Sequence, residues 1–295
     1  MSCKVKKAVI PAAGFGTRFL PFTKSVPKEL IPLVDKPVIQ YVVEEAVNSG
    51  IEQILLVISS EKEAIIRHFN PVPELERRLE ERNKTQMLEE VRCASKLAEI
   101  HYVYQQELNG LGDAVARAKY FVGNEPFAVL LGDTVMDSDI SRPVTGQLLD
   151  VFERTASSVV ALEEVPLEKV SKYGIADGEE VEPGVLKIRQ MVEKPAPESA
   201  PSRLAFAARY VFTPEIFDAL DQTGRGKNNE IQLTDAMQKM LVSGSMFGCR
   251  VKGKRYDIGS KTGFLKSTVE FGLRRPEFRD EFAAYLREVV AKMES

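Results

Sequence analysis

The chain has few cysteines and few histidines. Its 295 residues include three cysteines, Cys3, Cys93 and Cys249, and two histidines, His68 and His101. The cysteine count is odd, the spacings are long and no CxxC pair occurs, which argues against a disulfide framework or a zinc site and indicates a reducing compartment. With only two histidines, a histidine-based metal site is also disfavoured.

A large excess of one charge and a long apolar run are missing as well. The formal net charge is −3, so nothing predicts a general attraction to nucleic acid or to an anionic membrane. No apolar run approaches the roughly 18 residues that span a bilayer, and the first residues do not read as a signal peptide. We therefore expect a cytoplasmic protein without nucleic-acid or membrane partners, in which any basic patch is local and directed at a small ligand.

Strand and helix signals alternate through the first half of the chain. Several of the expected strands are apolar throughout, which is typical of a parallel sheet covered on both faces. Strands are expected at residues 7–11, 54–59, 100–105 and 127–133, and helices at 36–50, 61–69 and 112–121. Later segments, at 157–165, 184–195 and 204–214, mix polar and apolar residues and predict antiparallel additions. The predicted fold class is α/β: a Rossmann-like, mixed but mainly parallel central sheet flanked by helices.

The chain shows no Pro/Gly/Ser-rich linker that would separate two cores. We therefore expect a single domain over residues 1–295. Residues 72–98 are strongly charged and predict a helical insertion, for which a solvated surface is favoured over a partner-binding helix. Residues 261–295 predict a helical segment at the end of the chain.

A glycine turn follows the first expected strand, in the stretch PAAGFGTRFLPFTKSVPKELIP. Gly14 and Gly16 leave backbone N–H groups free to approach a ligand, and such groups can cradle phosphate oxygens. Arg18, Lys24 and Lys28 follow, and several cations suit a polyphosphate. A glycine turn with solvated lysines is the alternative on residue types alone.

Two common nucleotide motifs are absent from this turn. Phe19 stands where GxGxxG requires its last glycine, and no GxxxxGK[ST] occurs. A nicotinamide oxidoreductase and a P-loop NTPase are therefore both disfavoured.

The combination of motifs is more specific than any one of them. GFGTRFLPFTKSVPKELIPLVDKPVIQY is followed in order by QQELNGLGDAV, FAVLLGD, SKYGIA, MVEKP, ARYVFTPEIF, NNEIQLTDA and RYDIGSKTGF. This series, over most of residues 5–272, resembles the signature of bacterial UTP–glucose-1-phosphate uridylyltransferases in the sugar-nucleotidyltransferase family. The resemblance implies the nucleotide-diphospho-sugar transferase type of fold and transfer of a uridylyl group from UTP to α-D-glucose 1-phosphate. It also implies Mg²⁺ as the cofactor and a homo-oligomer.

Two aspartates are candidates for the metal. Asp133 follows a strand segment, and ligands of open α/β sheets bind outside the carboxyl ends of strands. A carboxylate there can hold Mg²⁺, or it can cap a turn. Asp257 precedes Gly259 and can equally be a turn residue. The resemblance implies that Asp133 and Asp257 are the metal-binding pair, and Asp137 is a weaker candidate.

The base and the triphosphate have candidate residues in two stretches. Gln105 offers a donor and an acceptor that suit a pyrimidine edge, although the residue type alone favours an exposed polar side chain. The resemblance implies nucleotide binding by Ala12, Ala13, Gly14, Gly16, Thr17, Gln105 and Gly110. Arg18 and Lys28 are assigned to the triphosphate and its developing charge.

The sugar phosphate has candidate residues in MVEKP and SKYGIA. A carboxylate at Glu193 can accept hydrogen bonds from sugar hydroxyls, and Lys194 can pair with a phosphate, while a surface ion pair is the plain alternative. The resemblance implies that Gly174, Glu193 and Lys194 surround the sugar, with Lys194 on its phosphate. The expected catalytic set is Arg18, Lys28, Asp133 and Lys194.

The chain departs from the family pattern at two places. Ala208 stands where such sequences commonly have glycine, and the loop before Glu230 is longer than usual, which leaves the place of Glu230 open. Two other functions also stay open. One is a sister activity, a thymidylyltransferase or an enzyme for another sugar 1-phosphate, and the other is a non-catalytic nucleotide-sugar sensor.

Overall fold

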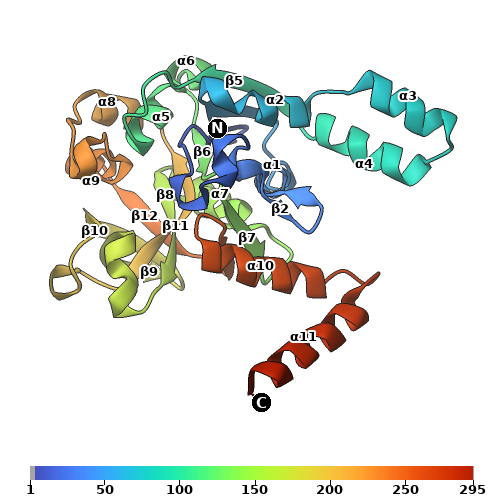
Figure 1. Cartoon of the computed structure of the whole chain (residues 1–295). Coiled ribbons are helices and arrows are strands. Elements are labelled where there is room, and N and C mark those ends of the chain that lie inside the picture. Colours follow the sequence, from blue (N-terminus) through green and yellow to red (C-terminus); the bar gives the residue numbers. More distant parts are fainter. Residues whose placement is uncertain (1–3, 295) are drawn as a thin grey trace.

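The computed structural model describes residues 4–294, and its body is one mixed sheet with helices on both faces (Figure 1). Within these residues, nine strands are hydrogen-bonded side by side. Their order across the sheet is β5 (Glu99–Tyr104), β4 (Gln53–Ile58), β1 (Lys7–Pro11), β6 (Phe127–Leu130), β11 (Leu204–Phe212), β8 (Ser158–Glu164), β12 (Met246–Arg250), β10 (Val185–Glu193) and β9 (Gly174–Glu182).

The strand directions divide this sheet into two parts. β1 pairs in parallel with both β4 and β6, and β4 pairs in parallel with β5. β11 runs antiparallel to β6 and β8, and β10 runs antiparallel to β12 and β9. The predicted parallel first half with antiparallel additions in the second half is therefore confirmed. Because β5, β4, β1 and β6 point the same way, their carboxyl ends meet at one edge of the sheet, where ligands of such folds bind.

Both faces of the sheet are buried, which explains the continuous apolar strands. Successive side chains point to opposite faces, so Ala8 and Ile10 belong to one apolar core and Val9 to the other. The first core is completed by α1 (Val38–Asn48), α2 (Glu63–Phe69) and α7 (Val144–Thr155). The second is completed by α5 (Leu111–Ala116), α6 (Lys119–Val122), α8 (Ile216–Asp221) and α9 (Leu233–Ser243).

Two small ribbons lie outside the main sheet. β7 (Thr134–Ser138) pairs antiparallel with β13 (Gly253–Asp257), and β2 (Pro32–Leu33) pairs antiparallel with β3 (Lys36–Pro37). The helix expected from residue 36 begins only at Val38, because Pro37 has an extended backbone and belongs to the second ribbon. The strand expected over residues 127–133 ends at Leu130, since the chain leaves the sheet there to enter the first ribbon.

Four helices lie at the periphery. α3 (Pro73–Glu81) and α4 (Thr85–Ser95) pack on each other and project from one side of the body (Figure 1). Asn83, with φ 53°, turns the chain between them. α10 (Lys261–Leu273) lies on the body, whereas α11 (Arg279–Glu294) extends away from it at the C-terminal end (Figure 1). Within residues 4–294, none of the helices has both the length and the apolar character needed to cross a membrane.

Candidate active site

The glycine loop between β1 and β2 is folded back on itself. It contains three 3₁₀ turns, Thr17–Phe19, Phe22–Lys24 and Lys28–Leu30. Gly16 has φ 67°, and a Cβ there would lie 3.1 Å from Cβ of Lys28 and 3.2 Å from its Cγ and Cδ. The Thr23 hydroxyl donates to the Gly16 carbonyl at 2.9 Å. Glycine is therefore favoured for two reasons: its backbone is left-handed, and the Lys28 side chain passes close to its Cα.

Lys28 is aimed at Asp133. Its ammonium donates to Oδ2 of Asp133 at 2.7 Å, and both side chains are about one-fifth exposed (19% and 20%). Burial works against both charges. The Lys28 and Arg18 cations nevertheless hold the pKa of Asp133 below its ordinary value, and Asp133 together with Glu29 holds the pKa of Lys28 above its own. The two groups are therefore charged around neutral pH.

A second ion pair, between Lys62 and Glu29, is more deeply buried and lies next to the first. Glu29 is 1% exposed and receives hydrogen bonds from Lys62 at 2.8 Å on both carboxylate oxygens. Burial raises the pKa of Glu29 in spite of Lys62, and burial lowers the pKa of Lys62 in spite of Glu29. Each partner therefore depends on the other to remain charged.

Asp133 and Asp257 are brought together by the ribbon of β7 and β13. Thr134 is paired with Asp257, so the residue before β7 lies beside the last residue of β13. The backbone N–H of Gly259 donates to Oδ1 of Asp257 at 2.9 Å. A Cβ placed on Gly259 would lie 3.0 Å from that oxygen, 3.2 Å from Oδ2 of Asp133 and 3.2 Å from a terminal nitrogen of Arg18. Both predicted carboxylates and Arg18 therefore meet at Gly259.

A cavity of about 510 Å³ lies on the glycine-loop side of Asp133. Lys28 and Asp133 line this cavity. So does every residue predicted for nucleotide binding: Ala12, Ala13, Gly14, Gly16, Thr17, Gln105 and Gly110. Gln105 directs its amide nitrogen inward, to Asp113 Oδ2 at 2.7 Å and to the Gly110 carbonyl at 3.2 Å. An ionised carboxylate can accept hydrogen bonds but cannot donate them. Asp113 therefore fixes the Gln105 amide with its nitrogen inward, which leaves Oε1 of Gln105 for a ligand.

A cavity of about 300 Å³ lies on the other side of Asp133. It contains the predicted sugar residues Gly174, Glu193 and Lys194, together with Arg18, Asp133 and Asp257. A Cβ on Gly174 would come within 2.4 Å of the Phe206 ring and 3.1 Å of Oε2 of Glu193, so only glycine fits.

Glu193 and Lys194 are held in place by their neighbours. Glu193 accepts a hydrogen bond from Thr234 at 2.6 Å and pairs with Lys194 at 2.9 Å. Lys194 has φ 48°, and its backbone N–H donates to the Tyr173 carbonyl at 2.9 Å.

The structure also places Glu230, whose position the sequence left open. Glu230 lines both cavities. The neighbouring Ile231 donates to the Asn109 carbonyl at 2.7 Å and accepts from the Gly112 N–H at 2.9 Å. A Cβ on Gly110 would lie 2.8 Å from Cβ of Glu230 and 2.8 Å from the Ile231 carbonyl. Gly110 and Gly112 therefore allow the loop that carries Glu230 and Ile231 to pack closely against residues 109–112.

Two residues considered from the sequence lie apart from this centre. Lys24 was grouped with Arg18 and Lys28, but it is exposed and lines neither cavity. Asp137, the fourth residue of β7, pairs instead with Arg274 at 2.8 Å. A larger cavity of about 920 Å³ lies between α1 and the α3–α4 pair and contains none of the predicted site residues.

The cavity of about 300 Å³, which we call the sugar-side cavity after the residues predicted for it, has further lining residues that the sequence analysis missed. Lys172, Arg255, Tyr210 and Thr234 all line it. The guanidinium carbon of Arg255 lies 4.3 Å from the Tyr173 ring centroid, and the side chain also pairs with Glu163. Lys172 lies inside the motif SKYGIA and Arg255 inside RYDIGSKTGF. Their positions in these motifs were the only sign in the sequence that they could belong to the site.

The donors near Gly259 fit a hard divalent cation. Within the described residues, no cluster of three or more His, Cys, Asp or Glu side chains could hold a metal alone. Two carboxylates nevertheless converge at Gly259, and Mg²⁺ is commonly bound by one or two carboxylates with phosphate oxygens and water completing its shell. The residues present therefore suit Mg²⁺ together with a phosphorylated substrate.

The chain matches known proteins over nearly its whole length. The family model described as "Nucleotidyl transferase" matches residues 7–271. A UTP–glucose-1-phosphate uridylyltransferase of Bacillus subtilis (strain 168) is 50% identical over 291 residues, which cover 99% of each chain.

Solved structures agree with this match. A UDP-glucose pyrophosphorylase complexed with UDP-glucose is 42% identical with a TM-score of 0.85, over 92% of this chain and 100% of the other. The UTP-bound enzyme of Acinetobacter baumannii is 38% identical with a TM-score of 0.89, over 96% and 99%. Both the family and the fold class that the motifs predicted are thereby confirmed, and the chain belongs to the nucleotidyl transferase family as a relative of the bacterial UTP–glucose-1-phosphate uridylyltransferases.

Proposed function

We propose that the chain transfers the uridylyl group of UTP to α-D-glucose 1-phosphate, giving UDP-glucose and pyrophosphate. One observation carries the proposal: Arg18, Asp133 and Asp257 converge at Gly259, where a cavity with the predicted base residues adjoins a cavity with the predicted sugar residues. A reacting phosphorus between the two cavities lies within reach of all three charges. Uridylyltransferase activity in the relatives supports the same choice.

Gln105 supplies the contact that reads the base. Its Oε1 is a hydrogen-bond acceptor, because Asp113 and the Gly110 carbonyl take up the amide nitrogen. Uracil offers an N3–H donor to such an acceptor, whereas cytosine has an unprotonated, accepting N3 at the same position. Two acceptors facing each other leave a buried group without a partner, which is costly. Thymine shares the N3–H, so discrimination against dTTP must come from its C5 methyl group or from its missing 2′-hydroxyl.

The charged residues bind the phosphates. Arg18 and Lys28 are placed to neutralise the triphosphate and the charge that develops on the departing pyrophosphate. Asp133 and Asp257 would hold Mg²⁺, which when bound supplies a positive charge to the phosphate oxygens. Lys28, whose ammonium donates to Oδ2 of Asp133 at 2.7 Å, lies beside that carboxylate and would bind a phosphate oxygen of the nucleotide.

Lys194 and Glu193 hold the attacking group. Lys194 pairs with the phosphate of glucose 1-phosphate, and Glu193 accepts hydrogen bonds from sugar hydroxyls. A phosphate oxygen of the sugar forms a bond to the α-phosphorus as the α–β bridging bond breaks, and pyrophosphate leaves with that electron pair. No protein nucleophile is needed, because a phosphate dianion is nucleophilic at neutral pH. The chain contributes orientation and charge, which dominate such transfers.

A substrate matrix tests this function. Pyrophosphate release with Mg²⁺ is measured for UTP, dTTP, ATP, CTP and GTP, each against glucose, galactose and N-acetylglucosamine 1-phosphates. The proposal predicts that UTP with glucose 1-phosphate dominates. A dominant different pair would move the specificity to a sister activity, and UDP-glucose binding with no release from any pair would indicate a sensor.

A further inference from the structure

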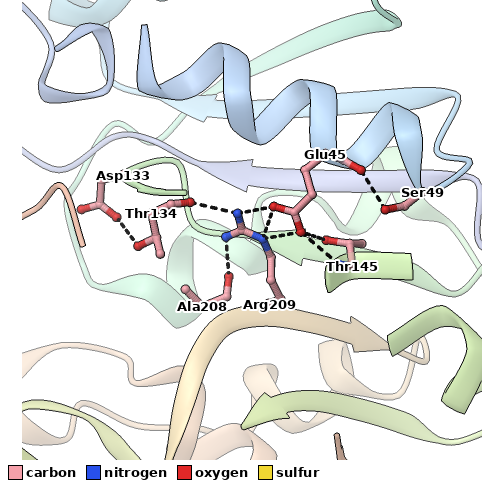
Figure 2. Close-up of polar contacts among 7 residues, drawn as sticks. All are labelled: Glu45, Ser49, Asp133, Thr134, Thr145, Ala208 and Arg209. Atoms are coloured by element: carbon pink, nitrogen blue, oxygen red, sulfur yellow. Dashed lines mark hydrogen bonds and ion pairs between the residues drawn. The ribbon is translucent and has the colours of Figure 1, made fainter. Parts of the chain in front are cut away.

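Arg209 is a fully buried cation in the middle of the sheet, on β11, with an exposed fraction of 0%. A buried charge is tolerated only when it is paired and hydrogen-bonded. Its guanidinium donates to both carboxylate oxygens of Glu45, at distances from 2.6 to 3.1 Å, as Figure 2 shows. Its remaining contacts are the Thr134 carbonyl at 2.9 Å and the Ala208 carbonyl at 3.1 Å.

Glu45 is itself held from its other side. It extends from α1, and Oε1 accepts from the backbone N–H of Thr145 at 3.0 Å and from the Thr145 hydroxyl at 2.7 Å (Figure 2). Thr145 lies in the first turn of α7. The pair is therefore anchored by two helices that pack on the same face of the sheet, which fixes the guanidinium in one orientation.

The far edge of the guanidinium reaches the metal side of the site. The carbonyl of Thr134 that it binds belongs to the residue directly after Asp133. The hydroxyl of the same Thr134 donates to Oδ1 of Asp133 at 3.4 Å (Figure 2). A continuous series of contacts thus runs from α1 to the carboxylate that lies beside Asp257.

The guanidinium also reaches the sugar side. The Ala208 carbonyl that it binds accepts the backbone N–H of Leu131 at 3.1 Å as well. Ala208 has φ 61°, a left-handed backbone that costs a residue with a side chain about 1–2 kcal/mol. It lies where the pairing of β11 with β8 loses its register, between Phe206 and Tyr210, and it lines the sugar-side cavity. The two carbonyls bound by Arg209 therefore belong to two different chain segments, β7 directly after Asp133 and the middle of β11, and both residues line the sugar-side cavity.

We propose that Arg209, oriented by Glu45, is a positioning residue that fixes the Asp133–Thr134 turn and the Ala208 backbone relative to each other. The proposal rests on the proposed function, because the two segments carry the metal-binding aspartate and part of the sugar-side cavity of that reaction. Stability alone does not account for the pair, since replacing a buried ion pair by apolar side chains of similar volume is often neutral or stabilising. An apolar pair, however, would remove the guanidinium that joins the Thr134 and Ala208 carbonyls, and would leave Ala208 only the N–H of Leu131.

The test compares single variants with a charge-free double variant. Arg209→Met and Glu45→Leu each leave one buried charge unpaired, and each is expected to lower Tm by on the order of 10 °C. The double variant removes both charges and should recover most of that loss. Its kcat with UTP and glucose 1-phosphate should nevertheless stay about ten- to hundredfold below the wild type, with the KM for UTP nearly unchanged. Recovery of kcat together with Tm would overturn the proposal.

Two further variants keep the test decisive if the double variant does not fold. Arg209→Lys keeps a cation beside Glu45, but a single ammonium cannot reach the carbonyls of both Thr134 and Ala208. We therefore expect kcat to fall about tenfold or more while Tm changes by a few degrees. A wild-type kcat in Arg209→Lys would contradict the proposal. Leu148→Ala in α7 removes a fully buried side chain, and as a matched control it should lower Tm without this loss of kcat.

Metal affinity gives a readout that does not depend on turnover. Mn²⁺ binding in the presence of UDP-glucose, followed by electron paramagnetic resonance, should weaken several-fold in Arg209→Lys and in the double variant. Unchanged Mn²⁺ affinity in both variants would refute the positioning role. A wild type that binds Mn²⁺ and UDP-glucose but forms no product would instead refute the proposed function, while the comparison of Mn²⁺ affinities would still decide the role of Arg209.

Discussion

Gly259→Ala places one methyl group where three charged side chains meet. The new Cβ would lie 3.0 Å from Oδ1 of Asp257, 3.2 Å from Oδ2 of Asp133 and 3.2 Å from a terminal nitrogen of Arg18. Ordinary contacts of a Cβ lie at 3.4–4 Å, so each of the three groups must retreat by a few tenths of an ångström. Gly259 has no φ in the left-handed region, so the backbone itself accepts alanine.

The magnitude follows from the tolerance of the chemistry. Mg²⁺ demands near-ideal octahedral geometry at about 2.0–2.1 Å from its oxygen ligands. A misplacement of about 1 Å can cost a hundredfold in rate. Displacements of a fraction of that, acting on two metal ligands and a phosphate-binding cation together, should lower kcat about ten- to hundredfold. Stability should change little, with Tm within about 3 °C of the wild type.

The assay is pyrophosphate release from UTP and glucose 1-phosphate over a titration of Mg²⁺, with Tm measured on the same samples. The concentration of Mg²⁺ at half-maximal rate should rise together with the fall in kcat. Gly224→Ala is the matched control, because a Cβ there has no atom within 4 Å and the backbone is not left-handed. A Gly259→Ala enzyme with wild-type kcat and wild-type Mg²⁺ dependence would refute the reasoning that Asp133, Asp257 and Arg18 act at one point.

Three further substitutions probe other parts of the site. Lys62→Met leaves Glu29 unpaired and should lower the free energy of unfolding by about 3–5 kcal/mol at pH 8. Burial already raises the pKa of Glu29. A carboxyl whose pKa is higher folded than unfolded loses stability as pH rises between those two values, so urea unfolding at pH 5 should show a smaller loss, and equal losses would contradict this account. Gln105→Leu should raise the KM for UTP about tenfold with a lesser effect on kcat, and an unchanged KM would remove Gln105 from base recognition. Lys194→Ala should raise the KM for glucose 1-phosphate about ten- to hundredfold, and an equal rise for UTP would argue against its place on the sugar phosphate.

Local chemistry made much of the site predictable from the sequence. The glycine turn after a buried strand, with Arg18 and Lys28 beyond it, indicated a phosphate site, and the structure places both cations beside Asp133. The apolar strands indicated a sheet covered on both faces, because only such a sheet buries every side chain of a strand. The ordered motifs then indicated the family, which the comparisons confirm.

Pairings between distant segments were beyond the sequence analysis. Asp133 and Asp257 meet because Thr134 pairs with Asp257 across a ribbon, and neither segment alone carries that register. Lys24 has the same charge as Lys28 and lies in the same loop, yet only the side chain of Lys28 packs against Gly16. Arg209 was overlooked for a related reason: an arginine in a strand is usually exposed, and its burial depends on Glu45 and Thr145, which lie on two other elements.

The most direct test of the account follows both products in one reaction and compares the wild type with Asp133→Asn. ³¹P NMR of UTP, glucose 1-phosphate and Mg²⁺ should show UDP-glucose and pyrophosphate forming one for one with the wild type. Asp133→Asn should be slower by about a hundredfold or more while still binding UDP-glucose. An Asp133→Asn enzyme that forms both products at the wild-type rate, or a wild type that binds UDP-glucose and forms neither product, would contradict the account.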